Sequence, residues 1–260
     1  MHVLGLACGA ADREWLLAEL YELGTLGIIE HDLPGGNARL EAFFETPFDA
    51  SPFTPFDPAW VVRDPDIHSW RDAWEPLPVG DRFFLVPDWR DDPAPEGRLR
   101  LTVHARQASG SGYHAPTQLM LRAMESTVTG GAFLDVGTGS GILSSAARLL
   151  GAGPVWACDI DPDALAEARA NAASAAFFLG SVRAVRTAAA STIAANLNAE
   201  ALVCLAADLQ RALAPDGHLI VSGFKARRLD RVRHAFPLHV HSILEDGDWR
   251  CMVLRHRRSI

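Results

Sequence analysis

The chain has 260 residues, 48% of them hydrophobic and 22% charged, which is typical of a globular protein with one large domain or two smaller ones. No apolar run approaches the roughly 20 residues of a membrane-spanning helix, and the first residues lack the basic segment and long apolar core of an export signal. The formal net charge of −8 argues against non-specific binding to nucleic acid, which requires a basic surface.

The cysteines predict a reducing compartment and no metal centre. Four of them are scattered along the chain without a CxxC pair, and no HExxH sequence occurs: Cys8, Cys158, Cys204 and Cys251. Free thiols in the cytoplasm fit this pattern better than disulfides or a zinc site. His239 and His241 fall on one predicted strand, but two histidines alone make a poor metal site. We therefore expect a cytoplasmic protein without metal or membrane contact.

Residues 1–50 are expected to form a small α+β unit. Apolar runs predict strands at residues 2–8, 27–31 and 38–45, with a helix over residues 12–23 between the first two. The order strand–helix–strand–strand is half of a ferredoxin-like motif. Because no catalytic constellation occurs here, we expect a unit that recognises a substrate or serves as a scaffold. Four residues share one face of the helix: Trp15, Leu16, Leu20 and Leu23.

A proline-rich stretch follows this unit. Prolines at positions 47, 52, 55 and 58 disfavour a continuous helix or central strand. We interpret residues 51–66 as a semi-rigid linker between two domains, residues 1–50 and 67–260; the alternative is a long surface loop inside one domain. Next, Trp70 and Trp74 lie on one side of a short predicted helix. Residues 81–86 and 99–105 are expected to be paired strands.

The most informative stretch runs from Phe133 to Pro162. A short apolar strand containing Asp135 leads into the glycine turn Gly137-Thr138-Gly139-Ser140-Gly141, and a helix is expected over residues 142–150. A second apolar run ends near Asp159, and Asp161-Pro162 then begins another helix with aspartate as its N-cap. A strand, a glycine turn and an acid about 20 residues later are typical of a nucleotide-type site, in which the acid binds ribose hydroxyls.

The spacing of the glycines narrows the ligand. Dinucleotide sites use G-x-G-x-x-G facing a pyrophosphate, whereas this turn is G-x-G-x-G preceded by Asp135. The aspartate suits a ligand with a cationic group, and S-adenosylmethionine has an ammonium and a sulfonium but no phosphate. The string resembles motif I of class I S-adenosylmethionine-dependent methyltransferases, which implies cofactor binding by Asp135, Gly137, Gly139 and Gly141. A glycine-rich turn in another α/β protein is the alternative.

The rest of the chain continues the alternation of strands and helices. Two strands joined by Asp246-Gly247 are expected to form an antiparallel hairpin at its end. The pattern predicts an α/β, Rossmann-like fold with a mostly parallel seven-stranded sheet, helices on both faces and this hairpin at its edge. Strands are expected at residues 175–179, 191–196 and 218–222, helices at 162–173, 200–213 and 225–235, a turn at 215–217 and a truncated connection at 180–190.

Several segments, in the same order, resemble the ribosomal protein L11 methyltransferase family. The resemblance spans residues 15–256 and is carried by WRDAWEPLPVGDRFFLVPDW, ASGSGYHAPTQLML, FLDVGTGSGIL, CDIDPDAL, AANLNAEAL and LAPDGHLIVSGF. It implies an enzyme that moves a methyl group from S-adenosylmethionine to lysine ε-amines, or to the N-terminal amine, of ribosomal protein L11. It also implies that the small first unit is a ferredoxin-like domain that grips this protein substrate.

The resemblance places the family's cofactor contacts on Thr117, Gly137, Asp159 and Asn196. Asp159 can accept hydrogen bonds from both ribose hydroxyls, and Gly137 lets the backbone approach the methionine moiety. Asn196 ends a predicted strand, where α/β sheets place their sites. Its amide can accept a hydrogen bond from the substrate amine and aim the lone pair at the methyl carbon, which is a catalytic role.

The loop before the glycine motif departs from the family's pattern. Ser109 stands where the family has phenylalanine, Ser111 and Tyr113 replace threonines, and Ala115 looks inserted. His114 is expected to order this loop. These changes leave open a methyltransferase of the same fold that acts on another protein or a small molecule, and a non-catalytic S-adenosylmethionine-binding module. Nucleic acid is a less favoured partner, because the basic helix at residues 225–235 belongs to an acidic chain.

Overall fold

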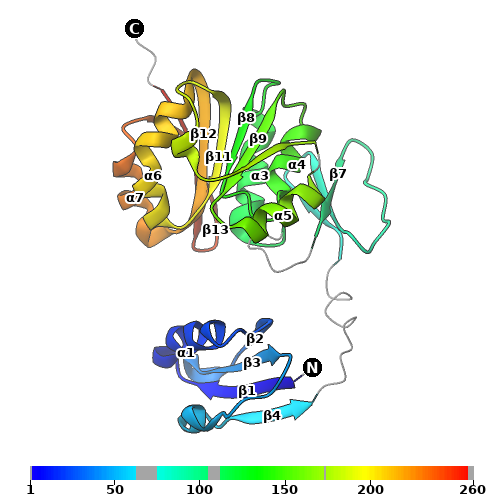
Figure 1. Cartoon of the computed structure of the whole chain (residues 1–260), viewed down its shortest axis with the longest axis vertical. Helices are drawn as coiled ribbons and strands as arrows, with labels where there is room; N and C mark the ends of the chain where they lie inside the picture. The colour runs from blue at the N-terminus through cyan, green and yellow to red at the C-terminus, as the bar shows by residue number, and fades with distance from the viewer. Residues whose placement is uncertain (1, 63–74, 105–111, 173, 257–260) are drawn as a thin grey trace. The chain divides into compact units, whose positions relative to one another are not determined.

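The structure is a computed structural model that describes residues 2–62, 75–104, 112–172 and 174–256 (Figure 1). The chain folds into two units, Met1–Trp74 and Glu75–Ile260. Each unit has its own sheet and its own hydrophobic core. The helix predicted around Trp70 and Trp74 lies outside the described residues.

The first unit is a four-stranded antiparallel sheet against which helix α1 (Ala10–Glu22) packs. Leu16 and Leu20 of α1 are buried, as predicted, but Trp15 and Leu23 are 50% and 47% exposed. The apolar stripe of the helix is therefore narrower than its sequence indicates. The strands have the order β2-β3-β1-β4 and comprise β1 (His2–Cys8), β2 (Gly27–Asp32), β3 (Ala38–Phe44) and β4 (Ala59–Val62).

Residues 51–62 differ from the linker that the prolines predict. They contain the 3₁₀ helix η2 (Ser51–Phe56) and β4, which pairs antiparallel with β1. Pro52 and Pro55 disfavour a long α-helix but are compatible with this short turn, and Phe53 is buried in the core of the unit. The resulting order, strand–helix–strand–strand–3₁₀ helix–strand, is close to a complete ferredoxin-like motif. Residues 63–66 lie outside the described residues.

The second unit is built on a seven-stranded sheet with the order β10-β9-β8-β11-β12-β14-β13. The pairs from β10 to β12 are parallel, and β14 is antiparallel to both of its neighbours. The predicted α/β fold with a mostly parallel sheet and a C-terminal antiparallel hairpin is confirmed. The strands are β8 (Phe133–Val136), β9 (Val155–Asp159), β10 (Ala176–Leu179), β11 (Ala190–Asn196), β12 (Leu213–Lys225), β13 (His239–Asp246) and β14 (Trp249–Arg255).

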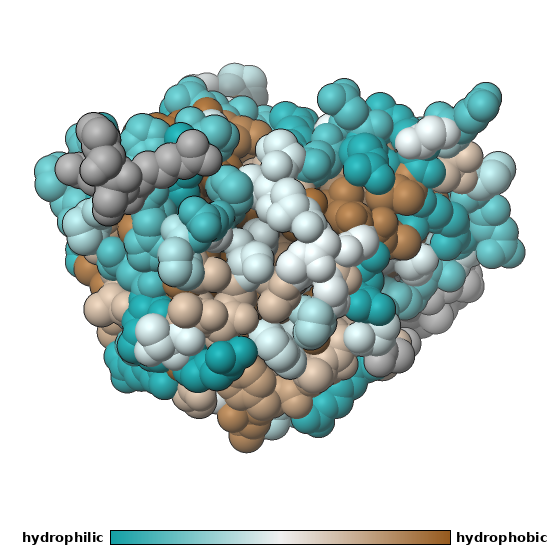
Figure 2. Space-filling model, turned by 90° about the horizontal axis from the view of Figure 1, so that it is seen from above, coloured by the Kyte–Doolittle hydropathy of each residue, from teal (hydrophilic) through white to brown (hydrophobic). Residues whose placement is uncertain are grey.

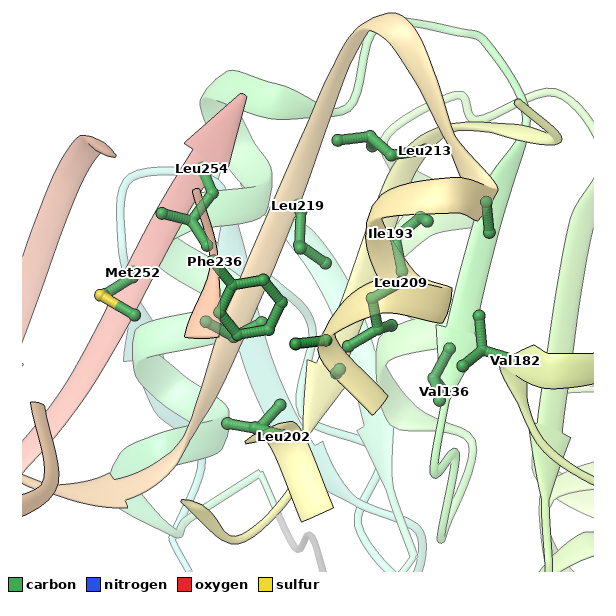
Figure 3. Packing of buried hydrophobic residues seen from close by; sticks show 14 of the residues in the cluster. Val136, Val182, Ile193, Leu202, Leu209, Leu213, Leu219, Phe236, Met252 and Leu254 are labelled. Carbon is green, nitrogen blue, oxygen red and sulfur yellow. The ribbon is translucent and has the colours of Figure 1, made fainter. Parts of the chain in front are cut away.

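Helices cover both faces of this sheet (Figure 1). On one side lie α3 (Ala115–Thr127), α4 (Ile142–Leu149) and α5 (Pro162–Asn171), and on the other α6 (Ala199–Ala212) and α7 (Leu229–Ala235). Figure 3 shows the core on the α6 side, where Leu209 and Phe236 pack close to Leu219 and Met252 of the sheet. Such burial contributes about 25 cal/mol per Å² of apolar surface and fixes the strands that carry the site.

Two connections differ from the sequence prediction. The turn expected at 215–217 lies within the bounds of β12. The pairing of β12 with β11 is interrupted there, because Ala190 pairs with Leu213 and Thr192 pairs with His218, so residues 214–217 have no partner in β11. The basic helix expected at 225–235 begins as a 3₁₀ turn, η4 (Ala226–Arg228), before α7. The truncated connection after β10 is confirmed as the short 3₁₀ helix η3 (Val182–Ala184).

A small sheet of β5 (Leu77–Val79), β6 (Phe83–Pro87) and β7 (Leu99–Val103) contacts α3 and α4. The predicted pairing of β6 with β7 is confirmed, and it is parallel. Glu125 connects helix α3, which covers the large sheet, to the turn between β5 and β6. Its carboxylate accepts hydrogen bonds from the backbone N–H groups of Asp81 and Arg82 at 3.0 and 2.9 Å.

Seen from above, the surface is mostly hydrophilic to neutral, and hydrophobic residues emerge in separate patches (Figure 2). Among the described residues, no helix combines the length and the hydropathy needed to cross a membrane.

Candidate active site

A cavity of about 1120 Å³ opens at the carboxyl ends of the parallel strands. Its walls come from the start of α3, the glycine turn after β8, the end of β9, the start of α5 and the ends of β11 and β12. This is the crevice in which open α/β sheets bind ligands. Five of the residues predicted for the site line it together: Thr117, Gly137, Gly139, Asp159 and Asn196. Asp135 and Gly141 lie behind this wall.

The glycine turn is anchored on β9. The backbone N–H groups of Gly137 and Thr138 donate to the carbonyl oxygen of Cys158 at 2.9 and 3.1 Å. Gly137 has a φ of 72°, which disfavours any residue with a Cβ atom. A Cβ at this position would also lie 2.4 Å from Cδ2 of Leu197 in the opposite wall. Gly137 is therefore required both for the turn and for the shape of the cavity.

Gly141 supports the site from behind. It has a φ of 81° and is the N-cap of α4. A Cβ atom here would lie 3.2 Å from the Cα atom of Ala168 in α5. The residue lets α4 and α5 approach each other, so its role is close helix packing and not direct contact with a ligand.

Asp159 ends β9 and presents its carboxylate to the cavity. One oxygen accepts the N–H of Gly139 at 3.0 Å and the other accepts the N–H of Asp161 at 3.1 Å. The backbone thus fixes the orientation of both oxygens, and each oxygen has further lone-pair capacity for a ligand hydroxyl. Two oxygens held side by side match the two hydroxyls of a ribose.

Asp135 is fully buried and takes a supporting role. Its Oδ2 atom accepts the hydroxyls of Thr138 and Ser144, both at 2.8 Å, which fixes the turn and the start of α4. Oδ1 has no hydrogen-bond partner among the described residues. Burial raises the pKa of this carboxyl from the usual 3.8 to about 6, although the two hydroxyls oppose the shift.

Asn196 and Thr117 meet across the cavity. Asn196 ends β11, and its Nδ2 atom donates to Oγ1 of Thr117 at 3.3 Å. Thr117 is fully buried in the first turn of α3. Oδ1 of Asn196 accepts no hydrogen bond from the residues that the structure describes, so it is available to a ligand.

An aromatic pair lines the cavity at the start of α3. The rings of His114 and Trp249 meet edge to face with centroids 5.3 Å apart, and Nζ of Lys225 lies 5.7 Å from the Trp249 ring centroid. Burial lowers the pKa of His114, so its ring is neutral at neutral pH and does not repel a cationic ligand. From the sequence alone, His114 is expected only to order its loop, and no local pattern indicates a role for Trp249.

Leu197 and Gly223 are two further residues of the wall that the sequence pattern does not indicate. Leu197 follows Asn196, and its N–H donates to the carbonyl of Ser222 at 3.0 Å. Gly223 has a φ of 94°, and a Cβ there would lie 2.5 Å from the carbonyl oxygen of Leu197. The glycine in the segment VSGF was the available indication, but the contact that requires it depends on the pairing of β11 with β12.

The wall of the cavity carries several acidic side chains. Carboxylates line the side formed by β9 and α5, and no lysine or arginine is found among the described residues of the wall. A diphosphate would meet repulsion here, whereas a ligand with a cationic group would be attracted. The lining carboxylates are those of Asp159, Asp161, Asp163 and Glu167. Within the described part of the chain, no group of three or more His, Cys, Asp or Glu residues is arranged to hold a metal ion.

The chain is similar to known proteins over most of its length. The family model described as ribosomal protein L11 methyltransferase (PrmA) matches residues 61–257. The ribosomal protein L11 methyltransferase of Symbiobacterium thermophilum is 38% identical over 187 residues, which are 69% of this chain and 62% of that protein. The one of Geobacter metallireducens is 37% identical over 212 residues, or 79% of this chain and 70% of that protein.

A solved structure agrees with these relatives. The crystal structure of ribosomal protein L11 methylase from Lactobacillus delbrueckii subsp. bulgaricus has a TM-score of 0.65 and 28% identity to this chain. The match covers 71% of this chain and 99% of that one. The chain spans about three fifths of the length of the first curated relatives, 62% for Symbiobacterium thermophilum and 61% for Gloeobacter violaceus.

Proposed function

Since the chain belongs to the ribosomal protein L11 methyltransferase family, we propose that it transfers methyl groups to lysine ε-amines of ribosomal protein L11, with the N-terminal amine as a second acceptor. S-adenosylmethionine is the cofactor that the family and its class I methyltransferase fold imply. The observation that supports this function best is the single cavity that gathers Thr117, Gly137, Gly139, Asp159 and Asn196.

The cavity fits this cofactor chemically. Asp159 offers two fixed carboxylate oxygens for the ribose hydroxyls. The bare backbone at Gly137 and Gly139 allows close approach of the methionine part. The acidic wall suits the ammonium and the sulfonium. When bound, the cofactor supplies an activated methyl group on a good leaving group, so the protein needs mainly to position the acceptor.

The acceptor amine is prepared by its surroundings. A lysine side chain has a pKa of about 10.4 in water and must lose a proton before it can attack. Transfer from water into a partly buried cavity disfavours the ammonium form and lowers that pKa. Oδ1 of Asn196 can then accept an N–H of the neutral amine and hold its lone pair in line with the methyl carbon. Catalysis rests on proximity and orientation.

The test is transfer of labelled methyl groups. We expect the purified protein to label ribosomal protein L11 from methyl-labelled S-adenosylmethionine, with the label on lysines in peptide mass spectra. Asn196→Ala should lower the rate of label transfer. Unlabelled L11 together with intact cofactor binding would contradict the proposed substrate.

A second candidate keeps the fold and changes the acceptor to another protein or a small molecule. The loop before the glycine motif, which departs from the pattern that the resemblance implies, motivates it, and Tyr113 is one of its described residues. Its hydroxyl donates to the carbonyl oxygen of Glu75 at 2.5 Å, and burial raises its pKa to about 12. The side chain therefore anchors the chain near the cavity instead of offering a free hydroxyl. Label on other ribosomal proteins or on free amines, but not on L11, would select this candidate.

The partners follow from the same proposal. Ribosomal protein L11 is the expected protein substrate, and we assign its recognition to the first unit, whose described residues contain none of the cavity's lining. We place the reaction in the cytoplasm, where the four cysteines remain free thiols. Nucleic acid is not an expected partner. A non-catalytic module is the remaining alternative, and product whose formation depends on Asn196 would exclude it.

A further inference from the structure

We infer that the second unit has another binding site, for a small anion of the phosphate class, at the end of the large sheet opposite the candidate active site. A cavity of about 760 Å³ opens there beside the start of β12. Its walls come from the residues before β11, the last turn of α6, the start of β12 and the end of β14. Whereas the wall of the first cavity is acidic, this wall contains two arginines and two histidines: Arg211, Arg255, His218 and His256.

The cavity lies where the pairing of β11 with β12 is interrupted. Residues 214–217 have no partner in β11, and Pro215 and Asp216 among them line the cavity. In the segment before β11, Ala188 has a φ of 51°, which is uncommon for a residue with a Cβ atom. Its N–H donates to the carbonyl oxygen of Arg211 at 2.9 Å. Such a conformation persists only where the surrounding structure fixes it, so this part of the wall is preformed.

The two arginines of the wall differ in what balances their charge. Arg211 forms an ion pair with Asp208 at 3.1 Å and donates to the carbonyl oxygens of Val182 and Val185, so it holds the wall together. Arg255 is half-buried, and within the described part of the chain its side chain has neither an ion-pair partner nor a hydrogen-bond acceptor. Removing a charge from water without a partner is unfavourable. A bound anion would supply that partner, and the guanidinium fork of Arg255 matches a phosphate group.

Histidines lie beside the free guanidinium. Arg255 of β14 pairs with His218 of β12 and with His239 of β13, so the three side chains leave the same face of the sheet. The rings of His218 and His241 meet with centroids 5.9 Å apart. Each imidazole can donate a hydrogen bond to an anion, and it adds a positive charge when it is protonated.

The charges of the wall favour a small anion. Among its described residues, Asp216 is the one carboxylate, and it is exposed to solvent. Arg255 therefore gives the wall an unbalanced guanidinium on its less exposed side. The chain as a whole has a net charge of −8, which disfavours a long polyanion such as RNA. A single phosphate group, free or on a small metabolite, fits these charges and the size of the cavity.

Binding should be linked to the protonation of His218. Burial, and then the neighbouring His241 and Arg255, lower the pKa of this ring, so it is neutral at neutral pH. A bound anion favours the protonated ring, so it should raise the pKa of His218, and its own Kd should fall as the pH is lowered. The titratable and charged groups that face the ring are His241 of β13, Arg255 and His256 of β14, Arg211 of α6 and Asp216 of its own strand.

The experiment titrates the whole protein with sulfate at constant ionic strength and follows the histidine ring resonances. Sulfate is the probe because its charge stays constant between about pH 6 and pH 7.5, and inorganic phosphate is the second probe. We expect saturable shifts of the His218 resonance, identified by its loss in His218→Gln. The Kd should rise at least about tenfold in Arg255→Gln, which removes a charge-assisted hydrogen bond. It should fall in Asp216→Asn, which removes the repelling carboxylate.

Arg233→Gln is the matched control. Arg233 is an exposed arginine of α7 that lines neither cavity, so this variant should bind sulfate as the wild type does. Shifts that do not saturate, an unchanged Kd in Arg255→Gln or a raised Kd in Asp216→Asn would overturn the inference. Binding of a single-stranded RNA that is tighter than that of sulfate, depends steeply on salt and is lost in Arg255→Gln would also overturn it, in favour of nucleic acid. None of these readouts depends on methyl transfer.

Discussion

At the scale of single residues, Asp135 and Asp159 have different structural roles. Asp159 lies in the cavity wall with both oxygens fixed by backbone N–H groups. Asp135 lies beneath the turn, and its carboxylate holds the hydroxyls of Thr138 and Ser144. Asp159 thus presents its carboxylate to the cavity, whereas Asp135 holds the glycine turn from beneath.

Asp159→Asn should weaken S-adenosylmethionine binding. The change removes the negative charge and turns one of two acceptors into a donor, at a cost of about 1.5–3 kcal/mol for a charge-assisted hydrogen bond. Titration calorimetry should therefore show a Kd raised by about 10- to 100-fold. Asp230→Asn, in the first turn of α7, is the control and should bind as the wild type does. Equal affinity in Asp159→Asn would remove this aspartate from the ribose site.

The raised pKa of Asp135 should make the stability of the ligand-free protein depend on pH. Its pKa is raised from 3.8 to about 6 in the folded protein by burial. Between these values the folded state holds a proton that the unfolded state has lost, so this group's contribution to stability falls as pH rises. The full cost, present above about pH 6, is about 3 kcal/mol.

Asp135→Asn removes this titration. Relative to the wild type, the unfolding free energy of the ligand-free variant should rise by up to about 3 kcal/mol between pH 4 and pH 7. Denaturant melts at several pH values measure it. A difference between the two proteins that is independent of pH would show that Asp135 is not the titrating group.

At the scale of elements, the site depends on the contact between the ends of β11 and β12. Gly223 touches the backbone of Leu197, and Leu197 touches Gly137 of the turn after β8. Glycines from two different strand ends thus enclose Leu197, which follows Asn196 in the cavity wall. Backbone neighbours cannot rotate away as side chains do, so this contact tolerates little change.

Gly223→Ala should destabilise the protein and disturb the site. The new Cβ would lie 2.5 Å from the Leu197 carbonyl oxygen, and we expect an unfolding free energy lower by about 2–4 kcal/mol. Gly151→Ala is a matched control, because its φ of 86° resembles the 94° of Gly223 but no atom lies within 4 Å of its Cβ position. Equal losses in the two variants would show that backbone strain alone, without collision, explains the effect.

The hydrogen bonds of Glu125 are expected to stabilise the turn between β5 and β6 in the small sheet. Glu125→Ala leaves the N–H groups of Asp81 and Arg82 without their acceptor, which should cost about 1–3 kcal/mol. Hydrogen exchange of amides in residues 77–87 should accelerate, while Glu125→Gln, which keeps one acceptor oxygen, should show a smaller change. Unaltered exchange in Glu125→Ala would mean that the carboxylate does not hold the turn.

At the scale of the whole molecule, the chain has two units, and the described residues that line the cavity all belong to the second. A fragment of residues 75–260 should therefore bind S-adenosylmethionine with a Kd within about threefold of the whole chain, a difference below 1 kcal/mol. Because we assign recognition of L11 to the first unit, its methylation of L11 should fall strongly. Full methylation by the fragment would refute that assignment.

The sequence predicted the second unit well because its fold depends on local patterns. The glycine turn, the Asp161 cap and the alternation of strands and helices are short-range features, and each matches the structure. The first unit was predicted less completely. The four residues of β4 become a strand through pairing with β1, more than fifty residues away in sequence, and the prolines before them indicate a linker.

For the site, the sequence indicated the positions of important residues more accurately than it indicated their roles. Asp159 and Asn196 could be placed because they end strands of a parallel sheet. The supporting position of Asp135, the hydrogen bond between Thr117 and Asn196 and the contact at Gly223 depend on burial and on contacts between distant elements. Those properties arise from tertiary structure and have no local pattern.

We expect one cavity to hold the methyl donor at Asp159 with its methyl group directed toward Asn196. A crystal structure of the protein with S-adenosylhomocysteine tests it most directly. We expect both ribose hydroxyls to bind the Asp159 carboxylate, the homocysteine part to lie along Gly137 and Gly139, and the sulfur atom to face Asn196. A ligand bound without contact to Asp159, or with its sulfur directed away from Asn196, would show that the cavity does not bind the methyl donor in this way.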